Sequence, residues 1–179
     1  MTDFDRQQIN AYIVQLSHGS ESALDGLAQL LSGRMLSVAL AVVKNRALAE
    51  DVVQDSFVRI LQKASSFKSD TNGYAWICKI VQNVALNVLR KEKRFRTQNI
   101  DDFPFICADV SVEEQGAASV AINEAMQNLT DTEKWLVYQK YFMDFTVRDS
   151  AKSVGKSKSA VQRILAQAEE KIRRNLSVT

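Results

Sequence analysis

The sequence predicts an all-α protein made of two small helical domains. Apolar residues recur at the helical spacing of three and four positions along most of the chain, and no useful run alternates with the period of two that marks a strand. Six glycines and one proline in 179 residues leave long stretches without a helix breaker. A chain of this length suits one ordinary domain or two small ones.

Eight helices account for the apolar spacing. Their predicted ranges, in chain order, are 5–16, 22–43, 47–65, 73–94, 112–127, 131–142, 147–154 and 158–175. Ser111 and Thr130 each stand three residues before a glutamate, Glu114 and Glu133, which is the pattern of a capping box. The helix starts near 112 and 131 therefore have a second signal besides spacing.

A linker is expected where the helical pattern breaks, between Thr97 and Val110, around Pro104. We expect a first domain over residues 1–96, an acidic linker over 97–117 and a second domain over 118–179. Charge follows the same division. The net charge is −1 over residues 1–78, +5 over 79–96, −8 over 97–133 and +6 over 134–179. Two separated basic blocks suit two stretches of nucleic acid phosphate, although such blocks are often only solvated surface.

Several function classes lack the residues they need. His18 is the single histidine, and Cys78 and Cys107 are isolated, so we expect no metal site, disulfide framework or cofactor. Cys78 is expected as a small buried residue. The sequence shows no paired catalytic acids, no nucleophile with its base and no phosphate-cradling glycine loop, so we expect no enzymatic activity. It also shows no signal peptide and no long unbroken apolar run, which predicts a cytoplasmic protein without membrane insertion.

Two helices of the first domain each combine an apolar stripe with a polar face. In the helix from residue 47 the predicted core stripe is Val53, Phe57, Ile60, Leu61 and Ala64, opposite Asp51, Gln54 and Asp55. In the helix from residue 73 the core stripe is Ile77, Ile80, Val81, Val84 and Val88, and a second face carries Lys79, Asn83, Asn87, Arg90 and Arg94. Residues 90–96 hold five basic side chains and one acid, more than a helix dipole needs. Phosphate binding explains the excess better.

The second domain has the layout of a helix-turn-helix. A short helix, a turn at Gly155 and a second helix capped by Ser157 follow one another, and Ala151 is small enough for a close crossing. The core face of the second helix is Val161, Ile164, Leu165, Ala168 and Ile172. Its outer face begins with Lys156, Lys158, Ser159, Gln162 and Arg163, where a recognition helix meets base edges.

Two stretches of the first domain, AEDVVQDSF at residues 49–57 and YAWICKIVQN at 74–83, together with the segment 129–176, carry a resemblance to a known family. They resemble a bacterial RNA polymerase sigma factor of the sigma-70 family, extracytoplasmic-function (ECF) type, over about residues 20–96 and 118–176. The resemblance implies a protein that binds core RNA polymerase, recognises two promoter elements and helps melt the first. It also implies promoter DNA and an inhibitory anti-sigma factor as partners.

Site residues follow from the same resemblance. The polymerase-binding residues would be Asp51, Gln54 and Asp55, which meet the clamp coiled coil. The minus-ten residues would be Phe67, Asn72, Lys79, Asn83, Asn87, Arg90, Lys91 and Arg94, with the loop 67–72 capturing a base flipped from the duplex. Phe67, Asn72 and Tyr74 could supply the contacts to that base. The minus-thirty-five residues would be Lys156, Lys158, Ser159, Gln162 and Arg163.

Departures from the family pattern bear on these roles. Asp55 stands where Glu is more usual, and Asn87 stands where Asp is common. Ala160, Ile164, Gln167 and Glu169 replace a Thr and three Arg residues, which predicts weaker intrinsic DNA affinity. For Trp76, packing inside the protein is favoured over stacking on DNA.

Two alternatives stay open on sequence. A stand-alone helix-turn-helix regulator with a sensing or dimerising N-terminal domain explains residues 156–163 but not the acidic face or the basic cluster at 90–96. A helical adaptor without DNA binding explains the acidic faces but not the two basic blocks.

Overall fold

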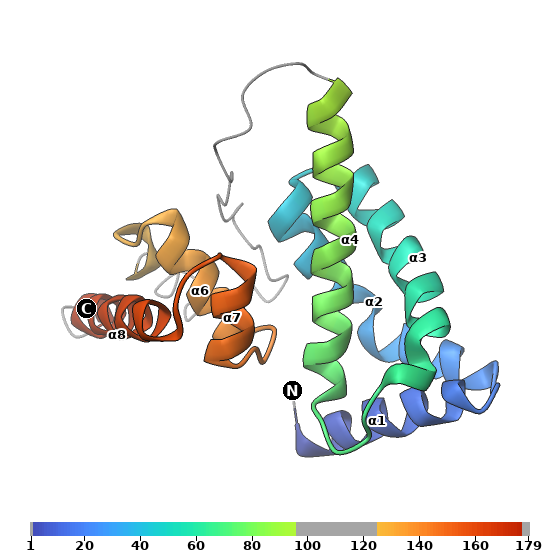
Figure 1. Cartoon of the computed structure of the whole chain (residues 1–179). Helices are drawn as coiled ribbons and strands as arrows, with labels where there is room; N and C mark the ends of the chain where they lie inside the picture. The colour runs from blue at the N-terminus through green and yellow to red at the C-terminus, as the bar shows by residue number, and fades with distance from the viewer. Residues whose placement is uncertain (1, 96–124, 177–179) are drawn as a thin grey trace. The chain divides into compact units, whose positions relative to one another are not determined.

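The computed structural model describes residues 2–95 and 125–176. All regular structure in these two stretches is helical, which confirms the predicted all-α class (Figure 1). The chain divides into two compact units, residues 1–103 and 104–179, and the division falls inside the segment predicted as linker. The predicted helix at 112–127 and the capping box from Ser111 to Glu114 lie outside the described residues, apart from the last three positions of that helix.

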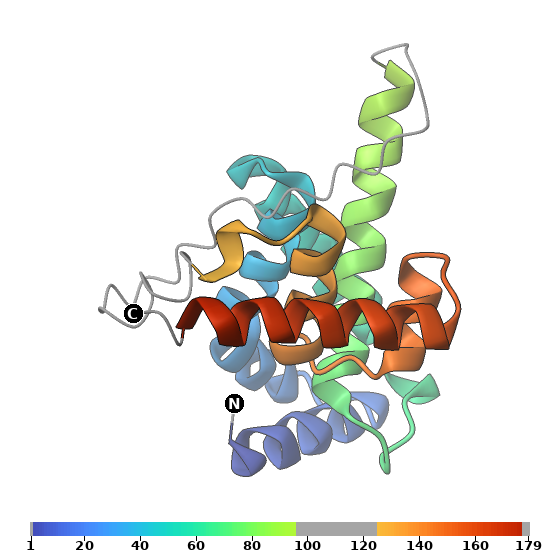
Figure 2. The ribbon, with the colours of Figure 1, turned by 90° about the vertical axis from the view of Figure 1, so that its left-hand side faces the viewer.

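The first unit is a bundle of four α-helices, α1 (Asp3–Ser17), α2 (Ser22–Val43), α3 (Arg46–Lys63) and α4 (Gly73–Phe95), with a short 3-10 turn η1 (Ala64–Ser66) after α3. Helix α2 contacts the other three helices, and α3 also packs along α4 (Figure 2). Side-chain caps set three helix starts: Thr2 accepts from Asp5 N (3.2 Å), Asn45 from Leu48 N (3.0 Å) and Asn72 from Ala75 N (3.0 Å).

Helix α2 forms the centre of this bundle. Leu27, Leu31 and Val38 are each at most 1% exposed, and together with Met35 they face the neighbouring helices. In the part of the chain that is described, α2 alone has the length and composition that a membrane-crossing helix would need. Gln29, Ser32 and Arg34 interrupt its apolar residues. Its contacts with α1, α3 and α4 are those of a core helix in a bundle.

The predicted core stripe of α3 is confirmed at Ile60 and Ala64, which are buried, and is wrong by a fraction of a turn at its other positions. The buried residues are Ala49, Val52, Ser56 and Ile60, whereas Val53 and Phe57 are half-buried and Leu61 is 44% exposed. Ser56 donates to the Val52 carbonyl (2.6 Å), so its polar group is satisfied inside the bundle. Helix α3 contacts both α2 and α4, and the small side chain of Ser56 is buried in this bundle whereas Leu61 is not.

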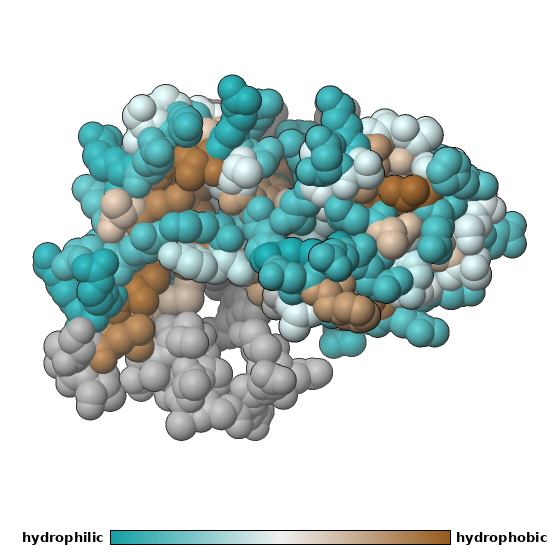
Figure 3. Space-filling view, turned by 90° about the horizontal axis from the view of Figure 1, so that it is seen from below, coloured by the Kyte–Doolittle hydropathy of each residue, from teal (hydrophilic) through white to brown (hydrophobic). Residues whose placement is uncertain are grey.

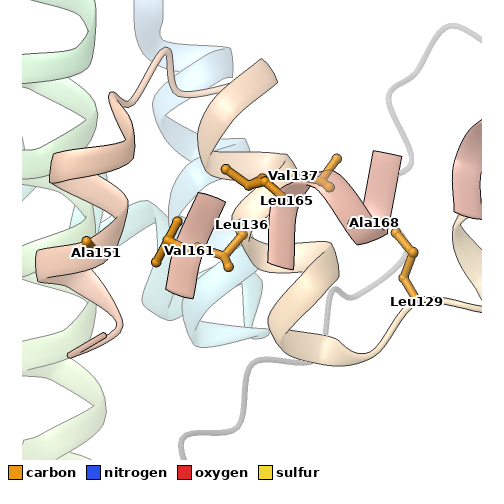
Figure 4. Packing of buried hydrophobic residues seen from close by; sticks show 7 residues of the cluster. All are labelled: Leu129, Leu136, Val137, Ala151, Val161, Leu165 and Ala168. Atoms are coloured by element: carbon orange, nitrogen blue, oxygen red, sulfur yellow. The ribbon is translucent and has the colours of Figure 1, made fainter. Parts of the chain in front are cut away.

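The second unit contains α6 (Asp131–Tyr141), α7 (Val147–Ser153) and α8 (Lys158–Leu176). Figure 4 shows Val161, Leu165 and Ala168 of α8 meeting apolar side chains of α6 and of the segment before it. Ile164 and Ile172 pack against the same cluster, which confirms the predicted core face of α8. The turn before α8 is also as predicted. Gly155 has a φ of 64°, and Ser157 accepts from Ala160 N (3.2 Å).

Candidate polymerase and DNA interfaces

The acidic face of α3 lies on the outside of the first unit. Asp51, Gln54 and Asp55 are all exposed, on the side opposite Val52 and Ile60. Their neighbour Glu50 pairs with Arg46 (2.9 Å), whereas no ion pair within the described residues involves Asp51 or Asp55. The two carboxylates therefore present their charge to solvent, as a docking face for a basic partner requires.

The polar stripe of α4 is exposed along its described length. Lys79, Asn83, Asn87, Arg90 and Lys91 all reach solvent, while the predicted core residues Ile77, Ile80, Val81 and Val84 are buried and Val88 is half-buried. Arg90 donates to Asn87 Oδ1 (3.1 Å), so these two side chains lie in contact on one face. The side chain of Arg94 falls outside the described part of α4. The helix therefore separates a core side from a side that carries amides and cations.

The loop before α4 combines exposed and inward-facing residues. Phe67 is half-buried, and its ring lies 5.3 Å from that of the half-buried Trp76 at 54°. Trp76 therefore packs against a side chain of the protein, as favoured. Asn72 is exposed, and its side chain caps α4. The face of the first unit that carries α1 and this loop is largely hydrophilic, with apolar atoms in separate spots (Figure 3).

The suggestion that Tyr74 contacts a base is wrong. Tyr74 is 1% exposed, beside the equally buried Cys78 and under the guanidinium of Arg34, which lies 5.9 Å from the ring centre. Burial raises the pKa of the Tyr74 hydroxyl, and the contact with Cys78 raises it further. Tyr74 is thus part of the core that anchors the start of α4. Cys78 is buried, as predicted.

The outer residues of the helix-turn-helix are exposed as a group. These residues are Lys156, Lys158, Ser159, Gln162 and Arg163. The first turn of α8 contains no acidic residue, so no carboxylate in that turn neutralises the cations there. Lys156 N donates to the Ala151 carbonyl (3.0 Å), which closes the turn between α7 and α8. The arrangement presents one cationic, hydrogen-bonding end of a helix to solvent.

Two ion pairs fix α8 against α6. Glu133 accepts from Lys171 Nζ (2.8 Å) and closes the predicted capping box by accepting from Thr130 N (2.8 Å). Glu169, one of the departures from the family pattern, accepts from Lys140 Nζ (2.6 Å) and from the Tyr141 hydroxyl (3.0 Å). An Arg at position 169 could not form either bond. Glu169 thus links α8 to Lys140 and Tyr141 of α6.

These contacts shift three pKa values. For Glu133, burial alone would raise the pKa, but the hydrogen bonds from Lys171 and Thr130 outweigh burial and lower it. The hydrogen bond between Lys140 and Glu169 raises the pKa of Lys140 and lowers that of Glu169. All three groups are therefore charged near neutral pH.

Asn10 is a residue that sequence reasoning missed. It lies on α1, and its side chain bonds the backbone of the loop before α4. The one sequence signal was a polar residue between two apolar ones, Ile9 and Ile13, that are both fully buried.

Comparison with known proteins supports the family assignment. Residues 27–95, from α2 to the end of α4, match the model of Sigma-70 region 2. Over these residues the chain matches the sigma-70 family. The sigma factor SigV of Bacillus subtilis is 24% identical over 131 residues, which are 73% of this chain and 77% of SigV. The ECF sigma factor SigM of Mycobacterium tuberculosis is 24% identical over 159 residues, which are 88% of this chain and 79% of SigM.

Two solved structures share the fold of this chain. CnrH, solved with the cytosolic domain of CnrY, aligns with a TM-score of 0.58 and 17% identity over 96% of this chain and 98% of CnrH. RpoE of Bartonella quintana, solved with the anti-sigma factor NepR, aligns with a TM-score of 0.54 and 18% identity over 86% of this chain and 96% of RpoE. Both alignments extend beyond region 2 into the second unit.

Proposed function

We propose that this sigma factor binds core RNA polymerase through α3, reads a minus-ten element through α4 and the loop before it, and reads a minus-thirty-five element through α8. The observation that carries the proposal is the pairing, in one chain, of a region 2 match with a helix-turn-helix whose outer face is cationic. A stand-alone regulator leaves the exposed acids of α3 without a role. The work of such a protein is binding and melting in the cytoplasm, with no catalytic chemistry of its own.

The polymerase contact rests on Asp51, Gln54 and Asp55. The exposed carboxylates of Asp51 and Asp55 complement a basic coiled coil. Such charge complementarity raises the association rate and sets specificity more than it adds affinity. Val58 (52% exposed) and Leu61 (44% exposed) continue the outer side of α3. On this face the acids can attract a basic partner, and the apolar side chains of Val58 and Leu61 can exclude water from the contact.

The two DNA contacts rest on different chemistry. On α4, Asn83 and Asn87 can read base edges, and Arg90 and Lys91 can bind phosphates. On α8, Gln162 and Arg163 stand where a recognition helix reads the major groove. Lys158, and Lys156 in the turn before α8, stand where such a helix meets the DNA backbone. Because Glu169 and Glu170 are acids, the far part of α8 offers less positive charge to DNA. Tethering to polymerase then supplies much of the effective concentration at the upstream element.

An anti-sigma factor is a further proposed partner. The structures of CnrH and RpoE are both complexes, with CnrY and with the anti-sigma factor NepR respectively. A protein with this fold and an exposed α3 face has surface available to such a partner.

The experiment that tests the polymerase contact reverses the charge of Asp51 and Asp55 to Lys together. We expect weaker binding to core polymerase with unchanged helicity, because both residues face away from the core. Asp25→Lys on α2 is the matched control, an exposed acid on another helix of the same unit. Equal polymerase affinity of a folded Asp51/Asp55 variant and the control would contradict the assignment.

A second experiment separates the two DNA contacts. The holoenzyme first selects its promoter from a randomised DNA library. Lys158→Ala with Arg163→Ala should then weaken upstream footprints, whereas Asn83→Ala with Arg90→Ala should reduce permanganate reactivity at the downstream element. Loss of a phosphate contact lowers the slope of log K against log salt by about 0.9. Loss of a base contact instead reduces discrimination by about 1–3 kcal/mol. Identical defects from both pairs would argue against two readers.

A further inference from the structure

One side chain of α1 fastens the loop that precedes α4. The Asn10 amide nitrogen, Nδ2, donates to the Thr71 carbonyl (2.8 Å) and to the Ser69 carbonyl (3.2 Å). Its amide oxygen, Oδ1, accepts from Gly73 N (2.9 Å). A single amide therefore holds three backbone groups that lie about sixty residues further along the chain, and both its donors and its acceptor are used.

Gly73 makes this close approach possible. A Cβ at position 73 would overlap Asn10 Oδ1 and would lie 2.8 Å from Ile13 Cδ1. Ile9 and Ile13 are fully buried on either side of Asn10, so the amide projects from a part of α1 that cannot move without opening the core. The glycine and the asparagine thus form a matched pair.

The bonds leave the outer side of the loop open. Lys68, Ser69, Asp70 and Thr71 are all exposed, while their backbone is held from the α1 side. Within the loop, the N–H and the hydroxyl of Thr71 both donate to the Lys68 carbonyl (2.9 and 2.7 Å). Figure 1 shows this connection between α3 and α4 running beside α1. The loop is a preset backbone that displays polar side chains.

We propose that Asn10 is a positioning residue for promoter opening, which presets the loop 68–72 so that it can receive an unpaired base of the minus-ten element. The inference rests on the proposed function of that loop. It adds α1, which lies outside the matched region 27–95, to the minus-ten reader. The physical reason is preorganisation: a loop already ordered in the free protein does not lose backbone freedom when DNA binds. Base extrusion itself costs free energy, so a loop that also had to order would capture the base poorly.

The test compares two Asn10 variants in the holoenzyme. Asn10→Ala removes all three bonds but favours the helix, so α1 itself gains helical propensity. Asn10→Asp keeps the size and the acceptor for Gly73 N, and it places an oxygen against the Ser69 and Thr71 carbonyls. Because Asp has the size of Asn, the packing of α1 is preserved. Asn10→Asp can therefore be tested even if Asn10→Ala fails to fold. Gln7→Ala, an exposed amide on the same helix, is the control.

The probe is fork-junction DNA with a single-stranded minus-ten segment, selected by the wild-type holoenzyme from a pool randomised over that segment. We expect Asn10→Asp to weaken binding of this probe by about 10-fold or more. Affinity for core polymerase and for fully duplex upstream DNA should stay at wild-type values. Gly73→Ala should give the same pattern, and Asn10→Ala combined with Gly73→Ala should cost less than the sum of the two, because both break one contact.

Three outcomes are decisive. The selective loss described above supports the positioning role. A folded Asn10→Asp variant that binds the fork as well as Gln7→Ala does, or that loses polymerase and upstream binding to the same degree, overturns it in favour of a purely structural bond. A wild-type holoenzyme that selects no DNA refutes the proposed function itself, and this inference with it.

Discussion

Replacing Glu133 by Gln should destabilise the second unit and leave the first unit unchanged. Glu133 is 6% exposed and joins the start of α6 to Lys171 near the end of α8. The amide oxygen of Gln can still accept from Thr130 N, so the cap is kept in part. The bond to a charged donor is lost, which would be worth about 1.5–3 kcal/mol if both groups were buried. The Lys171 side chain is 44% exposed, so we expect a loss of about 1–2 kcal/mol after discounting for solvent.

Further variants separate the cap from the ion pair. Glu133→Ala also removes the capping acceptor, which adds about 1 kcal/mol. Lys171→Met removes only the ion pair. The double variant Glu133→Gln with Lys171→Met should cost less than the sum of the two, because they share one interaction. Glu170→Gln is the control, since among the described residues Glu170 pairs only with Arg173 and Arg174 of its own helix. Its loss should cost about 0.3–0.5 kcal/mol per pair.

The assay uses the two tryptophans of the chain, one in each unit. Trp135 is 1% exposed in the second unit, and Trp76→Phe removes the signal of the first. Urea titration followed by fluorescence then reports the second unit alone in the full-length chain. A loss for Glu133→Gln no larger than that of the Glu170→Gln control would refute the reasoning that this buried carboxylate holds α6 and α8 together.

Four further predictions follow from the same structure and charges. The pKa values of Glu133 and Glu169 are lowered in the folded state. The stability that these two groups contribute is therefore complete above the ordinary pKa of about 4.5 and is lost as pH falls through the lowered values. The urea midpoint of the second unit should fall in acid, and it should fall less in the Glu133→Gln and Glu169→Gln variants. Gly155→Ala should destabilise the second unit by about 1–2 kcal/mol because φ is positive, although a Cβ there meets nothing within 4 Å. Gly33→Ala, helical with open space, should instead stabilise the first unit by about 0.5–1 kcal/mol, and a loss would contradict the propensity argument. The acidic linker could mimic RNA in the RNA exit path of the polymerase. If it does, neutralising Asp101, Asp102 and Asp109 should leave promoter binding intact and change the ratio of abortive to full-length transcripts. Unchanged yields would mean that the linker is only a tether.

Local chemistry made much of the fold predictable. The bounds of α2 agree with the apolar spacing at both ends, and the cap at Thr130 and the turn at Gly155 agree with their sequence patterns. Each of these features depends on residues within about four positions of one another, so a single stretch of sequence contains the cause. The exposed outer face of α8 follows in the same way, because its core face has a clear helical period.

Burial within a stripe was not decided locally. On α3 the sequence favoured Leu61 over Ser56, yet Ser56 is buried and Leu61 is 44% exposed. Tyr74, beside a polar loop, turned inward beneath Arg34. Periodicity defines the direction of an apolar face only to within about one residue, and the shapes of the neighbouring helices choose which residues of that face are covered.

What the sequence by itself determined is therefore the helices of the described residues, the cap at Thr130, the turn at Gly155 and the charge of the outer faces, since these depend on neighbours in the chain. Only the tertiary structure decided that Asn10 holds the loop at 69–73 and that Glu133 and Glu169 bind lysines on another helix. These partners are separated by 29 to 63 positions. Nothing in the spacing of residues specifies which distant groups meet, because that depends on how whole helices pack and on where a glycine leaves room.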